Sequence, residues 1–207
     1  MRILPFGLTG WLIEVDTTTE ATSLYDHLHA LAPTGPMALV TDLVPGARTV
    51  LLDVDRPGIT HTEVTALLGD WRPGTPRARH SAEIVEIPVR YGGPDLAEIA
   101  RLKEVSETAI VQAHTGSEFQ VAFCGFAPGF AYISGLPPIL HVPRLEQPRT
   151  SVQAGSVALA GGFTSVYPRR SPGGWRILGH TDVALWNVDR DPPALLPPGT
   201  RVRFTAA

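Results

Sequence analysis

The segment Ser171-Pro172-Gly173-Gly174-Trp175 combines residue types that can bind a ligand. The proline restricts the backbone before the turn, and Gly173 and Gly174 can adopt positive φ and allow a close approach to their backbone. Trp175 adds a large apolar surface with one N–H donor. We therefore predict that Gly173, Gly174 and Trp175 bind substrate or a partner protein; the alternative is that the glycines only form turns.

His114 is the candidate for proton transfer. It follows a predicted helix and precedes Thr115-Gly116, just before the first strand of a predicted β-domain. The ordinary pKa of imidazole lies near neutrality, so histidine can accept and donate protons during catalysis. We predict that His114 is a catalytic proton carrier in the mouth of this domain. The alternative is a cation that stabilises the carboxyl end of its helix.

Arg144 and Arg149 are candidate clamps for an anion or a carboxylate. Each follows a proline in a loop that is poor in apolar residues. A guanidinium group can hold a carboxylate with two parallel hydrogen bonds, which favours a substrate-binding role. The alternatives are exposed arginines, or ion pairs with Glu146 or with a partner protein.

Aromatic residues alternate at Phe126, Phe130 and Tyr132. In an extended segment, residues two apart point to the same face, so these side chains would share one face. They form either the core of the β-domain or the wall of a pocket. In the second case Phe130 contacts the substrate.

His180 and Asp182 are also two residues apart and point to one face of a strand. His180 is a candidate substrate-binding residue, acting with Asp182 or with an anion of the ligand. The alternative is a polar pair on a solvated face. The remaining histidines lack the spacing of metal ligands, so we predict no metal site in this chain.

The residues around the other potentially reactive side chains give little support for a catalytic role. Ser171 lacks a surrounding Gly-x-Ser-x-Gly motif, and Cys124 lies among the apolar residues of a predicted strand, as a buried thiol would. Because Cys124 is the only cysteine, the chain cannot form an internal disulfide. Lys103 is the only lysine and lies outside any phosphate-binding loop motif, so this chain alone is a poor candidate for an ATPase.

The second part of the chain must position most of these residues, and its pattern is mainly β. A strand from Glu83 to Tyr91 precedes two short helices, for which Asp95 and Ser106 are candidate N-caps. Short strands separated by turn signals then predict a closed or nearly closed barrel: Phe119–Gly125, Val157–Ala160, Thr164–Tyr167, Trp175–Leu178, Ala184–Val188 and Arg201–Phe204.

The first part predicts an α+β module of ferredoxin-like type, with the order β-β-α-β-β-α. A strand from Ala82 to Val89 either completes its sheet or begins the next unit. The segment from Trp71 to Ser81 is rich in proline, arginine and glycine and is the predicted linker. We therefore expect two domains, residues 1–80 and residues 81–207. The elements expected in the first are a hairpin of Arg2–Phe6 and Trp11–Val15, helices Glu20–Leu31 and Thr60–Leu68, and strands Met37–Val44 and Thr49–Val54.

Composition excludes several classes of function. The 207 residues are 43% hydrophobic and 18% charged, which is ordinary for a globular protein. The net charge of −3 provides no basic field for nucleic acid or for an anionic membrane. The amino terminus lacks the apolar stretch of a signal peptide, and no apolar run is long enough to span a bilayer. These features predict a cytoplasmic protein.

The ordered motifs of the second part resemble one family of bacterial proteins. This family includes the B subunit of 5-oxoprolinase, allophanate hydrolase subunit 1 and an inhibitor of a sporulation histidine kinase. The motifs that carry the resemblance are Gly125-Phe126-x-Pro128-Gly129-Phe130-x-Tyr132, Pro143-Arg144, Pro148-Arg149, Ala154-Gly155-Ser156-Val157, Tyr167-Pro168, Ser171-Pro172-Gly173-Gly174-Trp175, Pro88-x-x-Tyr91-Gly92-Gly93-x-Asp95-Leu96 and Pro198-Gly199-x-x-Val202-x-Phe204.

The resemblance implies a cyclophilin-like barrel for the second domain and a heteromeric complex. The expected partners are a second subunit of related barrel fold and a third, catalytic subunit. The expected function is that of a subunit, inactive alone, of an ATP-dependent 5-oxoprolinase, a hydrolase of a cyclic amide. ATP with magnesium is expected for the complex and no cofactor for this chain. The alternatives are a regulator that inhibits a sensor histidine kinase by docking around Trp175, and an allophanate hydrolase subunit. His180 stands where the family usually has arginine.

Overall fold

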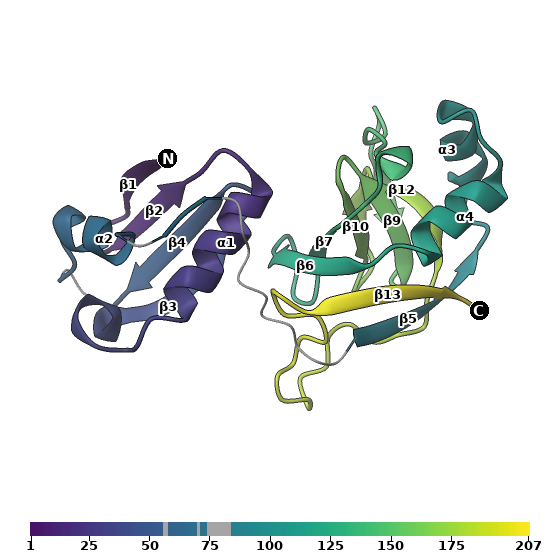
Figure 1. The fold of residues 1–207 in the computed structure, drawn as a ribbon. Coiled ribbons are helices and arrows are strands. Elements are labelled where there is room, and N and C mark those ends of the chain that lie inside the picture. Colours follow the sequence, from purple (N-terminus) through teal and green to yellow (C-terminus); the bar gives the residue numbers. More distant parts are fainter. Residues whose placement is uncertain (56–57, 70, 74–83) are drawn as a thin grey trace. The chain divides into compact units, whose positions relative to one another are not determined.

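The computed structural model describes residues 1–55, 58–69, 71–73 and 84–207 (Figure 1). The chain divides into two compact units, Met1–Arg79 and His80–Ala207. Most of the predicted linker, Trp71 to Ser81, and the expected domain boundary after residue 80 lie outside the described residues. Each unit has a core of its own and is described separately.

The first unit contains one antiparallel sheet in the strand order β1-β2-β4-β3 (Figure 1). Apolar side chains of the sheet pack with the helices, because Leu24 and Leu28 of α1 share a buried cluster with Ile13, Val50 and Leu52. The elements are β1 (Arg2–Phe6), β2 (Gly10–Glu14), α1 (Thr18–His29), η1 (Gly35–Leu39), β3 (Val40–Pro45), β4 (Thr49–Val54) and α2 (His61–Leu67).

Both helices of this unit begin after a threonine whose side chain caps the first turn. The Thr17 side chain accepts a hydrogen bond from the backbone N–H of Glu20 at 3.1 Å. Thr60 and Glu63 form a reciprocal capping box. A side-chain acceptor at this position satisfies one of the free N–H groups of the first turn, which explains where each helix starts.

Two expectations for this unit need correction or stay open. The predicted strand from Met37 begins only at Val40, because a 3₁₀ turn with proline near its start occupies Gly35–Leu39. The ferredoxin-like arrangement is not confirmed: the sheet has the order β1-β2-β4-β3, and the strand that might have completed it pairs within the second unit.

The second unit is a closed seven-stranded barrel with the order β10-β7-β6-β13-β5-β12-β9, which confirms the predicted barrel. β5 and β13 run parallel over six residue pairs from Arg201↔Ile84 to Ala206↔Val89, and the other neighbours are antiparallel. The strands are β5 (Ile84–Tyr91), β6 (Phe119–Cys124), β7 (Ala131–Ser134), β9 (Ser156–Ala160), β10 (Phe163–Val166), β12 (Arg176–His180) and β13 (Arg201–Ala206).

Short elements outside the barrel wall complete this unit. They are α3 (Leu96–Leu102), α4 (Glu107–Thr115), η2 (Pro138–Leu140) and a two-stranded ribbon of β8 (Arg149–Val152) and β11 (Ser171–Gly173). Ser106 caps α4 as predicted, accepting from the backbone N–H of Ala109 at 3.1 Å. Within the described part of the chain, every helix is too short or too polar to cross a membrane.

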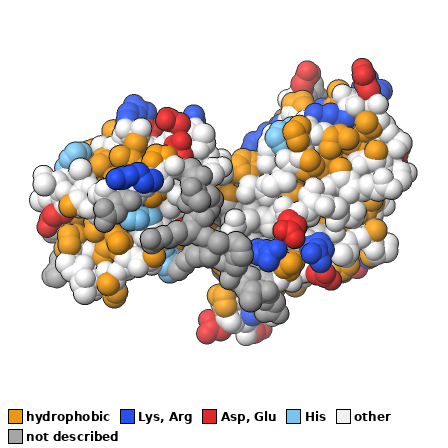
Figure 2. Space-filling model, viewed as in Figure 1, with side chains coloured by type: hydrophobic (Ala, Val, Ile, Leu, Met, Phe, Trp, Pro, Cys, Tyr) orange, Lys and Arg blue, Asp and Glu red, His pale blue; other side chains and the backbone are white. Residues whose placement is uncertain are grey.

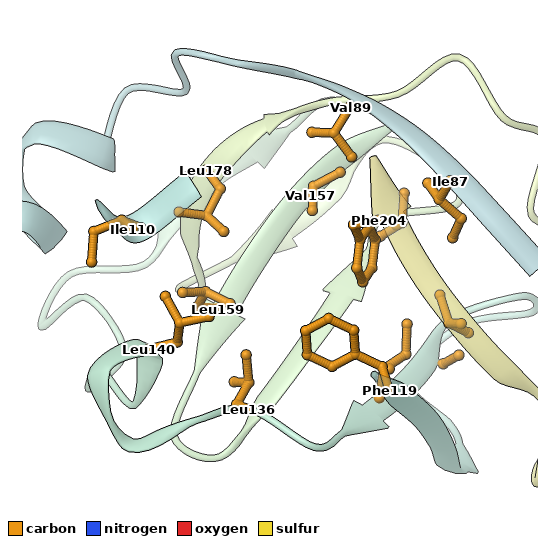
Figure 3. Packing of buried hydrophobic residues seen from close by; sticks show 14 of the residues in the cluster. Ile87, Val89, Ile110, Phe119, Leu136, Leu140, Val157, Leu159, Leu178 and Phe204 are labelled. Carbon is orange, nitrogen blue, oxygen red and sulfur yellow. The ribbon is translucent and has the colours of Figure 1, made fainter. Parts of the chain in front are cut away.

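The barrel interior is filled by side chains from several strands, as Figure 3 shows. Ile87 and Val89 come from β5, Leu178 from β12, and Phe204 from β13. The rings of Phe119 and Phe204 meet edge to face, with centroids 5.4 Å apart. The interior is therefore a packed core, and a binding site must lie outside it.

The predicted strand from Ala184 to Val188 is wrong. This segment is a loop with a single bridge between Trp186 and Ala194. The guanidinium group of Arg190 holds the loop instead, donating to four backbone carbonyls: those of Ala184 at 3.4 Å, Leu185 at 3.2 Å, Pro192 at 3.3 Å and Pro193 at 2.7 Å. Hydrogen bonds from a side chain thus take the place of the backbone hydrogen bonds of a strand. The alternation of residue types along the segment does not reveal this difference.

Candidate functional site

The barrel unit contains a cavity of about 500 Å³ beside the adjoining ends of β5 and β12. Its basic side chains are Arg90, Arg149 and His180, and no Asp or Glu occurs among the described residues that line it. Serine hydroxyls, the Gln153 amide and the backbone of Gly92 and Gly93 add polar groups. These donors are suited to a small anion. Each basic side chain also contacts a carboxylate that does not line the cavity: Asp95 for Arg149, and Asp182 for Arg90 and His180.

Arg149 is held in this wall by a buried carboxylate. Its Nη2 donates to Asp95 Oδ1 at 2.7 Å, and Asp95 Oδ2 accepts from the backbone N–H of Ile177 at 2.6 Å. The Asp95 side chain is 5% exposed and that of Arg149 is 30% exposed. Arg149 is therefore oriented from behind, while part of its side chain remains accessible.

This arrangement corrects the expected role of Asp95 as the cap of α3. Asp95 precedes the helix but its side chain makes no capping bond, because both carboxylate oxygens are used by Arg149 and Ile177. Gly93 makes the close approach possible, since a Cβ there would lie 2.5 Å from the Ile177 carbonyl oxygen. In the sequence, the glycine pair Gly92-Gly93 before Asp95 was the feature that could have indicated a close approach of this segment to the Ile177 backbone.

His180 occupies the end of β12, paired with Arg90 of β5 and with Ser156 of β9. Its Nε2 lies 3.3 Å from Asp182 Oδ1, so the predicted pairing of these residues is present. Arg90 holds the same carboxylate with two bonds, of 2.6 Å and 3.0 Å. The hydrogen bond from Arg90 lowers the pKa of Asp182 to about 2, so this carboxylate is ionised at neutral pH.

Phe130 and Trp175 lie in the core of the barrel unit, where the structure leaves them 2% and 4% exposed. They form an aromatic cluster with Tyr167: the Phe130 ring meets Tyr167 at 5.4 Å and Trp175 at 5.5 Å, both edge to face. Of the two interpretations of Phe130, this placement supports the core. The predicted contact of Trp175 with a substrate or partner is corrected, because so little of its surface is accessible.

Gly173 and Gly174 were expected to contact a ligand, but Gly173 packs against the Tyr167 side chain of the same chain. A Cβ on Gly173 would lie 2.9 Å from Cε1 and Cζ of Tyr167, and closer still to the hydroxyl oxygen. A Cβ on Gly174 would make only ordinary contacts, the nearest at 3.6 Å. Gly173 therefore makes room for a side chain of the same chain, and neither glycine lines the cavity among its described residues.

Arg144 does not share with Arg149 the described lining of the cavity. Its guanidinium carbon is 5.9 Å from the centroid of the Trp175 ring, a cation–π contact on the covered aromatic cluster. Arg144 is exposed and is not among the described residues that line the cavity. The structure thus brings Arg149 and His180 to one cavity and leaves Arg144 outside it.

His114 lies in the core and not in a mouth. It is fully buried, with Nδ1 2.7 Å from the Tyr91 hydroxyl, Nε2 3.1 Å from Thr164 Oγ1, and its ring centroid 4.3 Å from that of Phe204. Burial lowers its pKa to about 3. Both predicted roles are corrected, since a neutral, inaccessible imidazole neither exchanges protons with a ligand at neutral pH nor acts as a helix-end cation.

No cluster of three or more potential metal ligands occurs among the residues that the structure describes. The candidate binding groups of the cavity are the side chains of Arg149 and His180, which contact the carboxylates of Asp95 and Asp182. Sequence reasoning named two residues that line this cavity, Arg149 and His180, but did not predict the ion pairs that Asp95 and Arg90 form beside them.

Comparison with known sequences gives a family for this arrangement. Residues 1–196 match the family model described as carboxyltransferase domain, subdomain C and D. The chain is 40% identical over 171 residues to the B subunit of 5-oxoprolinase from Escherichia coli O157:H7, covering 81% of this chain and 78% of that protein. It is 45% identical over 124 residues to the B subunit of 5-oxoprolinase from Bacillus subtilis (strain 168), covering 58% of this chain and 52% of that protein.

Two solved structures share the fold of this chain. TTHA0988 superposes with a TM-score of 0.77 at 34% identity, covering 96% of this chain and 40% of that longer chain. PH0987 from Pyrococcus horikoshii superposes with a TM-score of 0.59 at 31% identity, covering 100% of this chain and 97% of the other. From the extent of the model match and the identity to these relatives, we conclude that the chain belongs to the carboxyltransferase domain, subdomain C and D, family, with the B subunit of 5-oxoprolinase among its members.

Proposed function

We propose that this chain is a subunit of an ATP-dependent 5-oxoprolinase complex and is inactive alone. One observation carries the proposal: 40% identity to the B subunit of 5-oxoprolinase from Escherichia coli O157:H7 over 78% of that protein. Identity at this level across most of a relative supports a shared role. The word subunit in the relative's name indicates that the reaction needs further chains.

The cavity supports a substrate of this kind. 5-Oxoproline is a small cyclic amide that carries a carboxylate, and the cavity offers Arg149 and His180 without a competing acidic group among its described lining residues. The Arg149 guanidinium is already oriented by Asp95, so binding would not have to order it. We propose that Arg149 holds the carboxylate and that His180 faces the ring of the bound lactam.

We assign ATP and magnesium to the partner chains. The described lining of the cavity contains no carboxylate, so these residues do not fit a magnesium ion. Lys103, the only lysine, donates to the Pro138 carbonyl at 3.1 Å and belongs to no phosphate-binding loop. The proposed partners are a second subunit of related barrel fold and a third, catalytic subunit.

An exposed apolar face supports the need for a partner. Phe126 is 61% exposed, Trp186 41% and Val188 75%. Phe126 adopts a φ of +68°, which is strained for a bulky residue, and a Cβ on Gly129 would lie 2.9 Å from the Trp186 Cβ, so the two loops are packed closely. We place the contact with the second barrel-fold subunit on this face.

The kinase-inhibitor alternative loses its main support. It required an exposed docking surface around Trp175, which is 4% exposed. The space-filling view shows acidic and basic side chains interspersed on the visible side of the barrel unit, without one large field of a single charge (Figure 2). An allophanate hydrolase subunit would use the same cavity and differ only in its ligand.

The test is an omission assay with purified subunits. We expect ATP hydrolysis that depends on 5-oxoproline when this chain and its partners are combined, and a loss of that activity when this chain is left out. Replacing 5-oxoproline by allophanate separates the two ligands. Activity that is indifferent to omission of this chain would overturn the proposal.

The partner face is tested by co-purification. Phe126→Ser should weaken assembly, because it removes an exposed apolar side chain from the proposed contact. Leu102→Ser is the matched control, since Leu102 is 43% exposed on α3 and outside this face. Equal assembly of both variants would contradict the placement of the contact.

A further inference from the structure

His180 differs from the other described histidines of the barrel unit in lining the cavity. His114 is buried in the core, and His141 bonds the Leu136 carbonyl at 2.9 Å. The His180 side chain is 39% exposed. Its ring is therefore accessible from the cavity and fixed on one edge by Asp182.

The hydrogen bonds determine which ring nitrogen is free. Asp182 is held by two bonds from Arg90 and is ionised, so its carboxylate can only accept. The Nε2 of His180 must then donate to Asp182 Oδ1, and in the neutral ring Nδ1 is left as a bare acceptor. No described residue forms a hydrogen bond with this Nδ1. An imidazole oriented by a carboxylate through one nitrogen, with the other free, is the arrangement of a general base.

Gly155 leaves room for the ring in this position. It adopts a φ of +79°, and a Cβ there would come within 2.5 Å of His180 Cε1 and 3.0 Å of Nε2. The position of the ring therefore depends on the bond to Asp182 and on the absence of a side chain at residue 155.

The charged groups around His180 are otherwise paired. Arg90 on β5 is neutralised by Asp182, and Arg149 on β8 is paired with Asp95. The adjacent residues from the β9 side, Gly155 and Ser156, carry no charge. His180 thus shares the Asp182 carboxylate with Arg90 and has no carboxylate of its own.

We propose that His180 is the general base of the cavity and that Asp182 and Arg90 are its positioning residues. This role rests on the proposed function, and the proton that His180 accepts is the amide proton of the substrate. The N–H bond of a cyclic amide, held through its carboxylate by Arg149, breaks, and the proton bonds to His180 Nδ1. The electron pair stays on the amide nitrogen and is delocalised onto the carbonyl oxygen. The imidazolium that forms lies beside the Asp182 carboxylate.

The first test is the tautomer of His180 in the full chain. Proton–nitrogen correlation NMR on protein with isotope-labelled histidine should show, in the neutral ring, a proton on Nε2 and none on Nδ1. Asp182→Asn should weaken this preference. A proton on Nδ1 in the unmodified chain would overturn the assignment, whatever the substrate proves to be.

The second test is kinetic and uses the assembled complex. His180→Gln should lower kcat by roughly 100-fold, as expected for loss of a general base, while KM changes little. His141→Gln is the matched control and should behave as the wild type.

The outcomes separate the two proposals. A wild-type kcat for His180→Gln, or an increase in KM alone, overturns the base while leaving the role of the chain in a 5-oxoprolinase complex intact. A wild-type complex that does not act on 5-oxoproline overturns the proposed function, and the NMR tautomer then decides whether His180 presents a free Nδ1 to the cavity.

Discussion

The Asp95 carboxylate and the Arg149 guanidinium, 54 residues apart in sequence, meet at 2.7 Å. Asp95 precedes α3 and Arg149 begins β8, so the ion pair ties the outer ribbon to the segment between β5 and α3. The second Asp95 oxygen bonds the Ile177 N–H of β12. Three segments that line or support the cavity are therefore joined at one buried carboxylate.

Asp95→Ala should destabilise the barrel unit by about 3 kcal/mol, because it leaves a partly buried guanidinium and a buried N–H without their partner. Glu118→Ala is the matched control, since its side chain is 69% exposed and its pairs with Arg201 and Arg203 lie at the surface. It should cost less than about 1 kcal/mol. Urea unfolding of both variants measures the difference, and equal losses would contradict the proposed role of Asp95.

Gly173→Ala should destabilise the protein by about 1–3 kcal/mol, because the added methyl group overlaps the Tyr167 phenol. Gly174→Ala, at the next position and with no contact closer than 3.6 Å, should be nearly neutral. Adding Tyr167→Phe to Gly173→Ala should recover part of the loss, because the nearest clashing atom is removed. Thermal unfolding of the variants tests this; a Gly173→Ala variant as stable as the wild type would refute the steric account.

Stability should fall in acid partly because of His114. Its pKa is lowered to about 3 in the folded protein, whereas the unfolded chain takes up this proton near pH 6.5. The contribution is therefore fully present above about pH 6.5 and is lost as the pH falls toward 3, with a slope of up to about 1.4 kcal/mol per pH unit.

The check is urea unfolding of wild type and His114→Gln at several pH values. Glutamine has a donor and an acceptor but does not titrate. The variant should be less stable near neutral pH, and its deficit should shrink as the pH falls below about 6.5. A deficit that is constant with pH would show that His114 takes up its proton equally in both states.

The two candidate arginines should separate in kinetics. Arg149→Lys should raise KM for 5-oxoproline about 10- to 100-fold in the assembled complex, because lysine keeps the charge beside Asp95 but loses the two-pronged donor. Arg144→Lys should leave KM near the wild-type value, since Arg144 stacks over Trp175 outside the cavity. The reverse ranking would move the carboxylate site from the cavity to the aromatic cluster.

Local features of the fold followed from the sequence. Ser106 was recognised as a cap because a side-chain acceptor before an apolar helical pattern acts within one turn. The barrel was predictable because its strands are short, alternating and separated by turn residues. These features depend on neighbours that are close in sequence.

Contacts between distant residues were not predictable in the same way. The Gly173 turn was expected to face a ligand, but its neighbour is the Tyr167 hydroxyl, brought there by the packing of the aromatic cluster. His114 was predicted to be a site residue from its place between a helix and a strand. Only the closure of the barrel shows that its ring packs against Phe119 and Phe204. Burial and long-range pairing decide the roles of such residues, and residue type alone does not.

The most direct test of the central claim is a crystal structure of the assembled complex with 5-oxoproline bound in the absence of ATP. We predict that the carboxylate of the ligand lies within hydrogen-bonding distance of the Arg149 guanidinium, with the lactam ring toward His180. Ligand bound elsewhere on this chain or entirely within a partner, with the Arg149 cavity empty, would contradict the account.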